Sequence, residues 1–220
     1  MKTIYEYLKK LNKNNNREWF NDNKEEYTGL KEGFTFAIDH LIYELSQFDS
    51  NLKGLQAKDC TFRIHRDIRF SKDKTPYKPH FSAFIAKGGK KSQYPGYYVQ
   101  MGANESTLAA GIWNPDKDLR KMIRDEILDN SEDLIDILED KDIKRMFGPI
   151  EGSALKRLPQ GYPLDFPYPE LLKQQDFLLV QRVDEKFFTS KDWLERTVEA
   201  FEVAFKFQNF FYPIVDDFLS

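Results

Sequence analysis

The middle of the chain, residues 80–113, reads HFSAFIAKGGKKSQYPGYYVQMGANESTLAAGIW. Three largely apolar runs, 80–87, 96–101 and 107–113, are separated by segments rich in glycine and polar residues. Runs of this length that are bounded by turn residues are typical of β-strands. The segment 102–106, GANES, is short enough to join the last two runs as a hairpin. This region therefore predicts three strands, two of them antiparallel neighbours.

Two further strands are predicted outside this region. Phe62, Ile64, Ile68 and Phe70 stand at alternate positions among polar residues, which is the period of a half-buried strand. Arg66 falls on the apolar side of that pattern. Residues 177–183, FLLVQRV, form another short apolar run. The sheet is therefore expected to contain about five strands.

Helical periodicity flanks the predicted strands. Apolar residues recur every three or four positions in a short helix that residues 12–16 break, in a long helical region from there to about residue 48, over 114–138 and from 190 onward. Gly29 and Gly33 either bend the long N-terminal helical region or divide it. The fold class predicted from these patterns is α+β, a single domain over 1–220 with a mostly antiparallel sheet packed against N-terminal, central and C-terminal helices. Its expected segments are helical 1–50, sheet-forming 58–113, helical 114–147, a proline-rich wrap over 148–169, and the strand and C-terminal helix of 177–220.

The composition excludes several classes of protein. The 220 residues include 19 Phe, 11 Tyr and 3 Trp, and this much aromatic surface argues against disorder of the whole chain. A single cysteine, Cys60, excludes an internal disulfide framework and a cysteine-rich zinc site. No apolar stretch approaches the ~18 residues of a membrane span, and the N-terminus lacks the pattern of a signal peptide. We therefore expect a soluble, cytoplasmic protein that does not bind membranes.

Charge is distributed unevenly along the chain. The net charge is −3, yet residues 58–91 contain ten Lys or Arg against three Asp or Glu, a local excess of seven positive charges. The rest of the chain is correspondingly acidic. A basic block on an acidic protein indicates either a binding surface for anions or a well-solvated pair of strand edges.

The basic block contains the strongest candidate site, residues 62–78, FRIHRDIRFSKDKTPYK. Arginine forks suit bidentate contacts with phosphate, sulfate or carboxylate, lysines add point charges, and the interleaved aromatic rings suit stacking on a base. The alternative is that Asp67 and Asp73 hold the arginines in structural ion pairs. Arg66 favours that alternative at its own position, because a buried guanidinium must be paired. The candidate anion-binding residues are Arg63, Arg66, Arg69, Lys72, Lys74, Tyr77 and Lys78.

Other motifs carry little chemistry. The glycine pair in 87–92, KGGKKS, lacks the first glycine of a phosphate-binding P-loop, because Phe84 stands at that position. His65 and His80 lie on neighbouring predicted strands, but no clustered carboxylates support a metal site. Cys60 lacks the local signature of a nucleophile. We predict no metal and no cofactor, and the catalytic residues, if there are any, stay unknown.

The chain resembles the domain-of-unknown-function family 2461 over nearly its whole length. Five segments carry the resemblance: 16–20 (NREWF), 66–78 (RDIRFSKDKTPYK), 96–98 (GYY), 110–113 (AGIW) and 155–162 (LKRLPQGY). The resemblance implies a single domain of bacterial type and no established activity. The family pattern often has His where this chain has Phe166, before Pro167. Within the fifth segment, Lys156 and Arg157 are expected to fold back near residues 66–78 and complete one anion pocket.

Three functions are left open by the sequence. The first is binding of a phosphorylated small molecule or a nucleic acid, although the acidic protein as a whole is unlike a dedicated nucleic-acid domain. The second is hydrolysis of a phosphorylated substrate at the same site, with acid–base groups among Asp67, Asp73, His65 and His80. The third is an interaction protein without a small ligand, whose basic segment docks an acidic partner. Whether the protein is an enzyme is not decided by the sequence.

Overall fold

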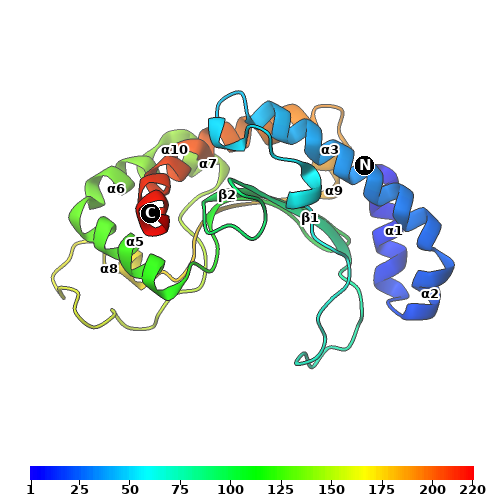
Figure 1. Ribbon diagram of the computed structural model, residues 1–220, viewed down its shortest axis with the longest axis horizontal. Coiled ribbons are helices and arrows are strands. Elements are labelled where there is room, and N and C mark those ends of the chain that lie inside the picture. The colour runs from blue at the N-terminus through cyan, green and yellow to red at the C-terminus, as the bar shows by residue number, and fades with distance from the viewer. The chain divides into compact units, whose positions relative to one another are not determined.

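The fold contains a four-stranded antiparallel sheet with its strands in the order β1-β2-β3-β4 (Figure 1). In the computed structural model, which describes residues 1–220, the strands are β1 (His80–Ala86), β2 (Gly96–Gly102), β3 (Ser106–Ile112) and β4 (Phe177–Val183). The bounds of β4 agree with the sequence prediction, and those of β1 to β3 agree within one residue. The α+β class and the antiparallel sheet are confirmed.

The fifth predicted strand, 62–70, is not formed. The chain there makes only two isolated bridges, Thr61 with Ala83 and His65 with Tyr77. Pro76 and Pro79 lie in the partner segment and have no N–H group to donate, so a regular ladder cannot be built along it. The sheet therefore has four strands rather than about five.

Helices account for most of the remaining ordered structure. The helix over 24–45 is continuous through Gly29 and Gly33, so these glycines neither divide it nor end it, and the break falls at Asn23 instead. None of the helices combines the length and hydropathy that a membrane span requires. The helices are α1 (Lys2–Lys13), α2 (Arg17–Asp22), α3 (Lys24–Leu45), the 3-10 helix η1 (Ser50–Leu52), α4 (Ala57–Cys60), α5 (Lys117–Asp129), α6 (Ser131–Glu139), α7 (Lys141–Met146), α8 (Pro169–Lys173), α9 (Glu185–Thr189) and α10 (Trp193–Leu219).

The chain divides into two compact units. The first unit comprises residues 1–90, 98–108 and 182–198, and the second comprises 91–97, 109–181 and 199–220. Strands β2, β3 and β4 and helix α10 each contribute residues to both units. The expected single domain over residues 1–220 stays a prediction.

Aromatic and aliphatic side chains form the core of the first unit. Helix α3 packs on α4 and β1, and α1 packs on α3 and α9. The most deeply buried side chains of α1 include Tyr5, whose hydroxyl lies 2.7 Å from the hydroxyl of Ser106 in β3. Burial raises the pKa of Tyr5 to about 12, so this hydroxyl stays protonated at neutral pH.

The second unit contains a very close approach between two strands. Gly111 in β3 has φ +132°, and a Cβ atom added there would lie 2.0 Å from the carbonyl oxygen of Phe177 in β4. Only glycine fits this contact without a shift of the backbone. The close approach lets Phe177 pack against Phe211 of α10, with ring centroids 5.7 Å apart.

Segment 148–169 is held to the second unit by polar contacts. The buried Asp176 carboxylate accepts bonds from the backbone N–H groups of Asn114 (2.7 Å) and Ser153 (2.9 Å). Burial raises the pKa of Asp176, but the bonds from Ser153 and Asn114 outweigh it and the pKa is lowered overall. Farther along, the Tyr162 hydroxyl donates to Asp125 at 2.8 Å. Asp176 and Asp125 thus fix the segment at two points.

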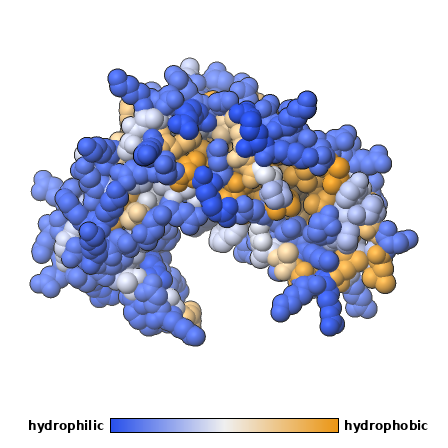
Figure 2. Space-filling view, turned by 180° about the vertical axis from the view of Figure 1, so that it is seen from behind, coloured by the Kyte–Doolittle hydropathy of each residue, from blue (hydrophilic) through white to orange (hydrophobic).

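Hydrophilic side chains cover most of the face seen in Figure 2, with apolar side chains gathered in separate areas. A few large apolar side chains are nevertheless exposed. They are Phe36, Tyr43, Phe70, Trp113, Leu164 and Leu219.

Candidate functional site

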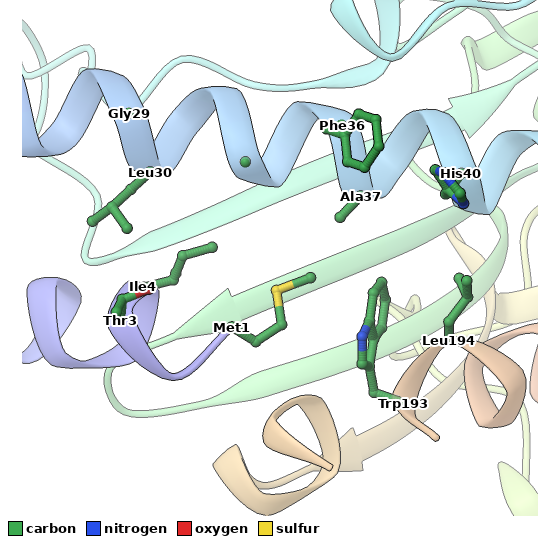
Figure 3. A pocket seen from close by; sticks show the side chains of 11 residues that line it. Met1, Thr3, Ile4, Gly29, Leu30, Phe36, Ala37, His40, Trp193 and Leu194 are labelled. Carbon is green, nitrogen blue, oxygen red and sulfur yellow. The ribbon is translucent and has the colours of Figure 1, made fainter. Parts of the chain in front are cut away.

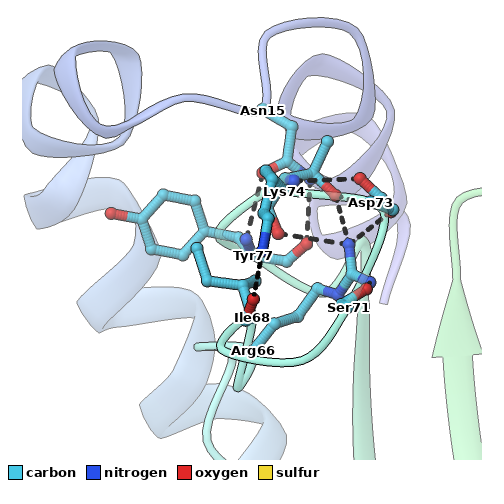
Figure 4. Close-up of polar contacts among 8 residues, drawn as sticks. Asn15, Arg66, Ile68, Ser71, Asp73, Lys74 and Tyr77 are labelled. Atoms are coloured by element: carbon cyan, nitrogen blue, oxygen red, sulfur yellow. Dashed lines mark hydrogen bonds and ion pairs between the residues drawn. The ribbon is translucent and has the colours of Figure 1, made fainter.

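The segment Arg66–Lys78, here called the basic loop, belongs to the first unit, and the bridge between His65 and Tyr77 lies at its base. Figure 4 shows polar contacts within the loop and with Asn15. The base of the loop is anchored by Asn15, whose side chain donates to the Tyr77 carbonyl (2.9 Å) and accepts from the Tyr77 N–H (3.1 Å). The Tyr77 ring stacks on Phe20 with centroids 4.0 Å apart and is only 5% exposed. Tyr77 therefore holds the base of the loop against the core.

Arg66 ties the two arms of the basic loop together. Its Nη1 atom donates to the Asp73 carboxylate and to both the hydroxyl and the carbonyl oxygen of Thr75, the last at 3.1 Å. Its Nη2 atom lies 3.4 Å from the Ser71 hydroxyl. The backbone N–H of Thr75 and the guanidinium of Arg66 together lower the pKa of Asp73 to about 2. The brace is therefore fully charged at neutral pH.

Arg69 is paired within its own arm of the loop. Its Nε and Nη2 atoms donate to the two oxygens of Asp67 at 3.0 and 2.7 Å, a bidentate contact. The hydrogen bonds from the Arg69 side chain make the largest contribution to lowering the pKa of Asp67, which is about 2. Across the loop, the Lys74 ammonium donates to the Ile68 carbonyl at 2.9 Å. The ion pairs weighed for Asp67 and Asp73 are thus present in the structure.

Apart from Arg66 and Arg69, the candidate cations of residues 62–78 form no ion pair. Arg63 and Lys72 are exposed and neither is in an ion pair, although the charge of Arg63 makes a small contribution to lowering the pKa of Asp67. Lys78 differs from both, because it is half-buried with its ammonium 5.4 Å from the centre of the Phe62 ring. Burial, with a smaller contribution from the charge of Arg63, lowers the pKa of Lys78. Arg63 and Lys72 are therefore the cations best placed to meet an external anion.

The ring of Phe70 is 95% exposed in the middle of the basic loop. The sequence pattern placed it on the apolar face of a strand, but no strand forms there. The Arg69 guanidinium lies 5.9 Å from the centre of the ring. The local sequence could have indicated a loop here, because Phe70 stands between Arg69 and the turn-forming run that begins at Ser71.

The family model described as "Conserved hypothetical protein (DUF2461)" matches residues 3–210. The chain belongs to the DUF2461 family. The match includes the whole basic loop and the second basic pair. No curated protein and no solved structure matched the chain.

The second basic pair of this DUF2461 protein lies in the second unit. Lys156 and Arg157 are exposed and form no ion pair. The expected pocket that they would share with the basic loop stays a prediction. Phe166 packs edge-on against Tyr168 with ring centroids 6.0 Å apart.

His65, His80 and Cys60 of the first unit differ in their exposure. His65 is exposed and makes edge-on ring contacts with Phe20 and Tyr77. Burial and the charge of Lys78 lower the pKa of His80 to about 4, so it is neutral at pH 7. Burial raises the pKa of the Cys60 thiol to about 12. No group of three or more His, Cys, Asp or Glu side chains is arranged to hold a metal ion.

A separate open groove of about 530 Å³ lies between the beginning of α1, α3 and the beginning of α10, all in the first unit (Figure 3). Ile4, Leu30 and Trp193 are among the apolar side chains that line it. At Gly29 and Gly33 an added Cβ atom would have no neighbour within 4 Å. These glycines leave room in the groove that the chain itself does not fill.

Proposed function

We propose that this DUF2461 protein binds a phosphate-bearing ligand through the basic loop and the adjoining Arg63. One observation carries the proposal: the loop is braced from within, while Arg63 and Lys72 are exposed and form no ion pair. Bracing reduces the conformational entropy that the loop loses on binding, and exposed cations outside ion pairs have N–H groups available to an anion. Arg66 is paired with Asp73 and Arg69 with Asp67. These two arginines therefore support the loop rather than make the principal contacts with the ligand.

A hydrolase at the same site receives less support. An efficient general acid or base has a pKa near the working pH. The carboxyls of Asp67 and Asp73 have pKa values of about 2 and are engaged by arginines, and His80 titrates near pH 4. None of these three groups is poised to exchange a proton near neutral pH, which leaves only His65 of the four acid–base candidates. The observations therefore support binding more than hydrolysis.

The test is a thermal-shift titration with sodium polyphosphate, inorganic phosphate and ATP. A ligand at ~100 times its Kd stabilises a protein by about 2.7 kcal/mol, which for a chain of this size is a rise in Tm of about 5–11 °C. The double substitution Arg63→Ala/Lys72→Ala is expected to remove the shift. The matched control is Lys117→Ala/Lys141→Ala, which changes the net charge equally at two exposed lysines of the second unit.

The outcome separates a local site from a general charge effect. Loss of the shift in Arg63→Ala/Lys72→Ala alone supports the proposal. No shift with any of the three compounds contradicts it, and so does an equal loss in both double variants.

A second candidate function is docking of the basic loop onto a protein partner. It is favoured by the exposure of Phe70, because interfaces bury aromatic anchors of this kind. A partner that co-purifies with the wild-type chain but not with Phe70→Ala, from a protein whose Tm is insensitive to phosphate compounds, would support docking instead.

A further inference from the structure

The basic loop holds the Phe70 ring away from the core. On one side, the Arg69 N–H donates to Asp67 Oδ1 at 3.2 Å, and Lys74 donates to the carbonyl of Ile68 at 2.9 Å. On the other side, the Ser71 hydroxyl lies 3.4 Å from Arg66. These contacts hold the residues on both sides of Phe70 in place. The ring itself is 95% exposed.

The surroundings of Phe70 are cationic. Residues 63–78 contain six Lys or Arg against two Asp, and of the cations Lys72 lies two residues from the ring. A flat π-face next to cations is the combination that single-stranded nucleic acids meet in their binding proteins, where bases stack and phosphates are neutralised. A duplex is less suited to this surface, because its bases are already stacked on one another and are not free to cover the ring.

A membrane surface fits the loop less well than a nucleic acid. Phe70 is one apolar side chain, and the exposed Asp67 and Asp73 carboxylates lie in the same loop, with 49% and 60% of their side chains accessible. Insertion of the ring among lipids would bring these two charges toward anionic headgroups and desolvate them.

We infer that Phe70 is a stacking platform for a base of single-stranded nucleic acid, whose phosphates contact the exposed cations of the same region. The inference rests on the proposed phosphate binding and names the class of ligand. Stacking on one aromatic ring does not select a base, so binding is expected to depend little on sequence.

The experiment measures fluorescence anisotropy of labelled oligothymidine of about 12 nucleotides, within the usual site size of such proteins. An abasic oligomer of equal length carries the same phosphates without bases. The wild-type chain is expected to bind oligothymidine more tightly than the abasic oligomer. Phe70→Ala should weaken binding of oligothymidine roughly tenfold and leave the abasic oligomer unaffected, since one stacked base contributes about 1–3 kcal/mol.

Phe70→Trp is the conservative variant and should retain the wild-type affinity for oligothymidine. It also supplies a second readout, because a base stacked on the new indole should quench its fluorescence. Since the ring at this position is exposed, neither substitution is expected to alter folding, and circular dichroism of both variants checks this.

Each contrary outcome overturns a different statement. Equal affinity of the wild-type chain for both oligomers, unchanged in Phe70→Ala, refutes stacking but leaves the proposed phosphate binding intact. No binding of either oligomer refutes stacking and, together with a negative polyphosphate titration, the proposed function as well. Phe70-dependent sedimentation with phosphatidylserine vesicles, without binding of oligothymidine, would assign the ring to a lipid surface instead.

Discussion

Replacement of Gly111 by alanine tests the close approach between β3 and β4. The added Cβ atom would lie 2.0 Å from the Phe177 carbonyl oxygen and 3.1 Å from a ring carbon of Phe207. The first distance is far inside van der Waals contact with a backbone atom, so β3 and β4 would have to separate. The residue also has φ +132°, which L-amino acids rarely adopt.

The magnitude follows from these two effects. A strained backbone conformation costs about 1–3 kcal/mol, and an overpacked core position costs about 1–3 kcal/mol. Gly111→Ala is therefore expected to lower the free energy of unfolding by roughly 4 kcal/mol. For a chain of this size the Tm should fall by roughly 8–16 °C.

The assay is urea and thermal unfolding followed by circular dichroism, with the wild-type and variant chains under the same buffer conditions. The midpoint should fall while the dependence on urea stays the same, which indicates a change in stability rather than in the surface exposed on unfolding. If Gly111→Ala unfolds within ~1 kcal/mol of the wild-type chain, the argument from close approach is refuted.

Three other substitutions or titrations give distinct expectations. Gly33→Ala should raise the free energy of unfolding by about 0.5–1 kcal/mol in the same urea assay, because a helical glycine with nothing near its Cβ position gains helix propensity at no steric cost; destabilisation would contradict this. The pKa values of Asp67 and Asp73 are lowered to about 2, so the loop brace contributes its full stability above the ordinary pKa of about 4 and loses it as pH falls through 2. Carboxyl NMR titration should find both midpoints near pH 2, and Arg66→Ala should move only that of Asp73 toward 3.8; unshifted midpoints in the wild-type chain would show that the brace is absent in solution. Cys60 is fully buried with its pKa raised to about 12, so a thiol reagent should label it only after urea unfolds the chain; rapid labelling of the native protein would disprove its burial.

Local patterns were sufficient for the regular elements. Strands β1 to β4 were predicted because each is a short apolar run bounded by turn residues, and the 102–106 turn fixes the β2–β3 pairing over a short separation. The strand predicted over 62–70 does not form. An alternating pattern describes only that segment and not the segment that would have to pair with it. That partner contains Pro76 and Pro79, which lack the N–H groups a ladder needs.

For the basic residues too, local features were predictable from the sequence and contacts between distant residues were not. The sequence identified residues 62–78 as the candidate site because charge and residue type are visible in it directly. The position of Arg66 on an apolar face also indicated that its guanidinium needs a carboxylate or another hydrogen-bond acceptor. The sequence did not choose between anion contacts and ion pairs, because that choice depends on how the loop folds back: Asp73 meets Arg66 across seven positions, and Asn15 meets Tyr77 across sixty-two.

By itself the sequence determined the α+β class, the antiparallel hairpin and the place of the basic block, since these depend on the period and chemistry of neighbouring residues. Only the tertiary structure decided which cations are engaged and where Phe70 points. Ion pairing requires donor and acceptor atoms within about 4 Å, and exposure depends on everything packed around a side chain. Ion pairing and exposure are both properties of the folded chain. The tertiary structure therefore decided that Arg66 and Arg69 brace the basic loop and that the Phe70 ring is exposed.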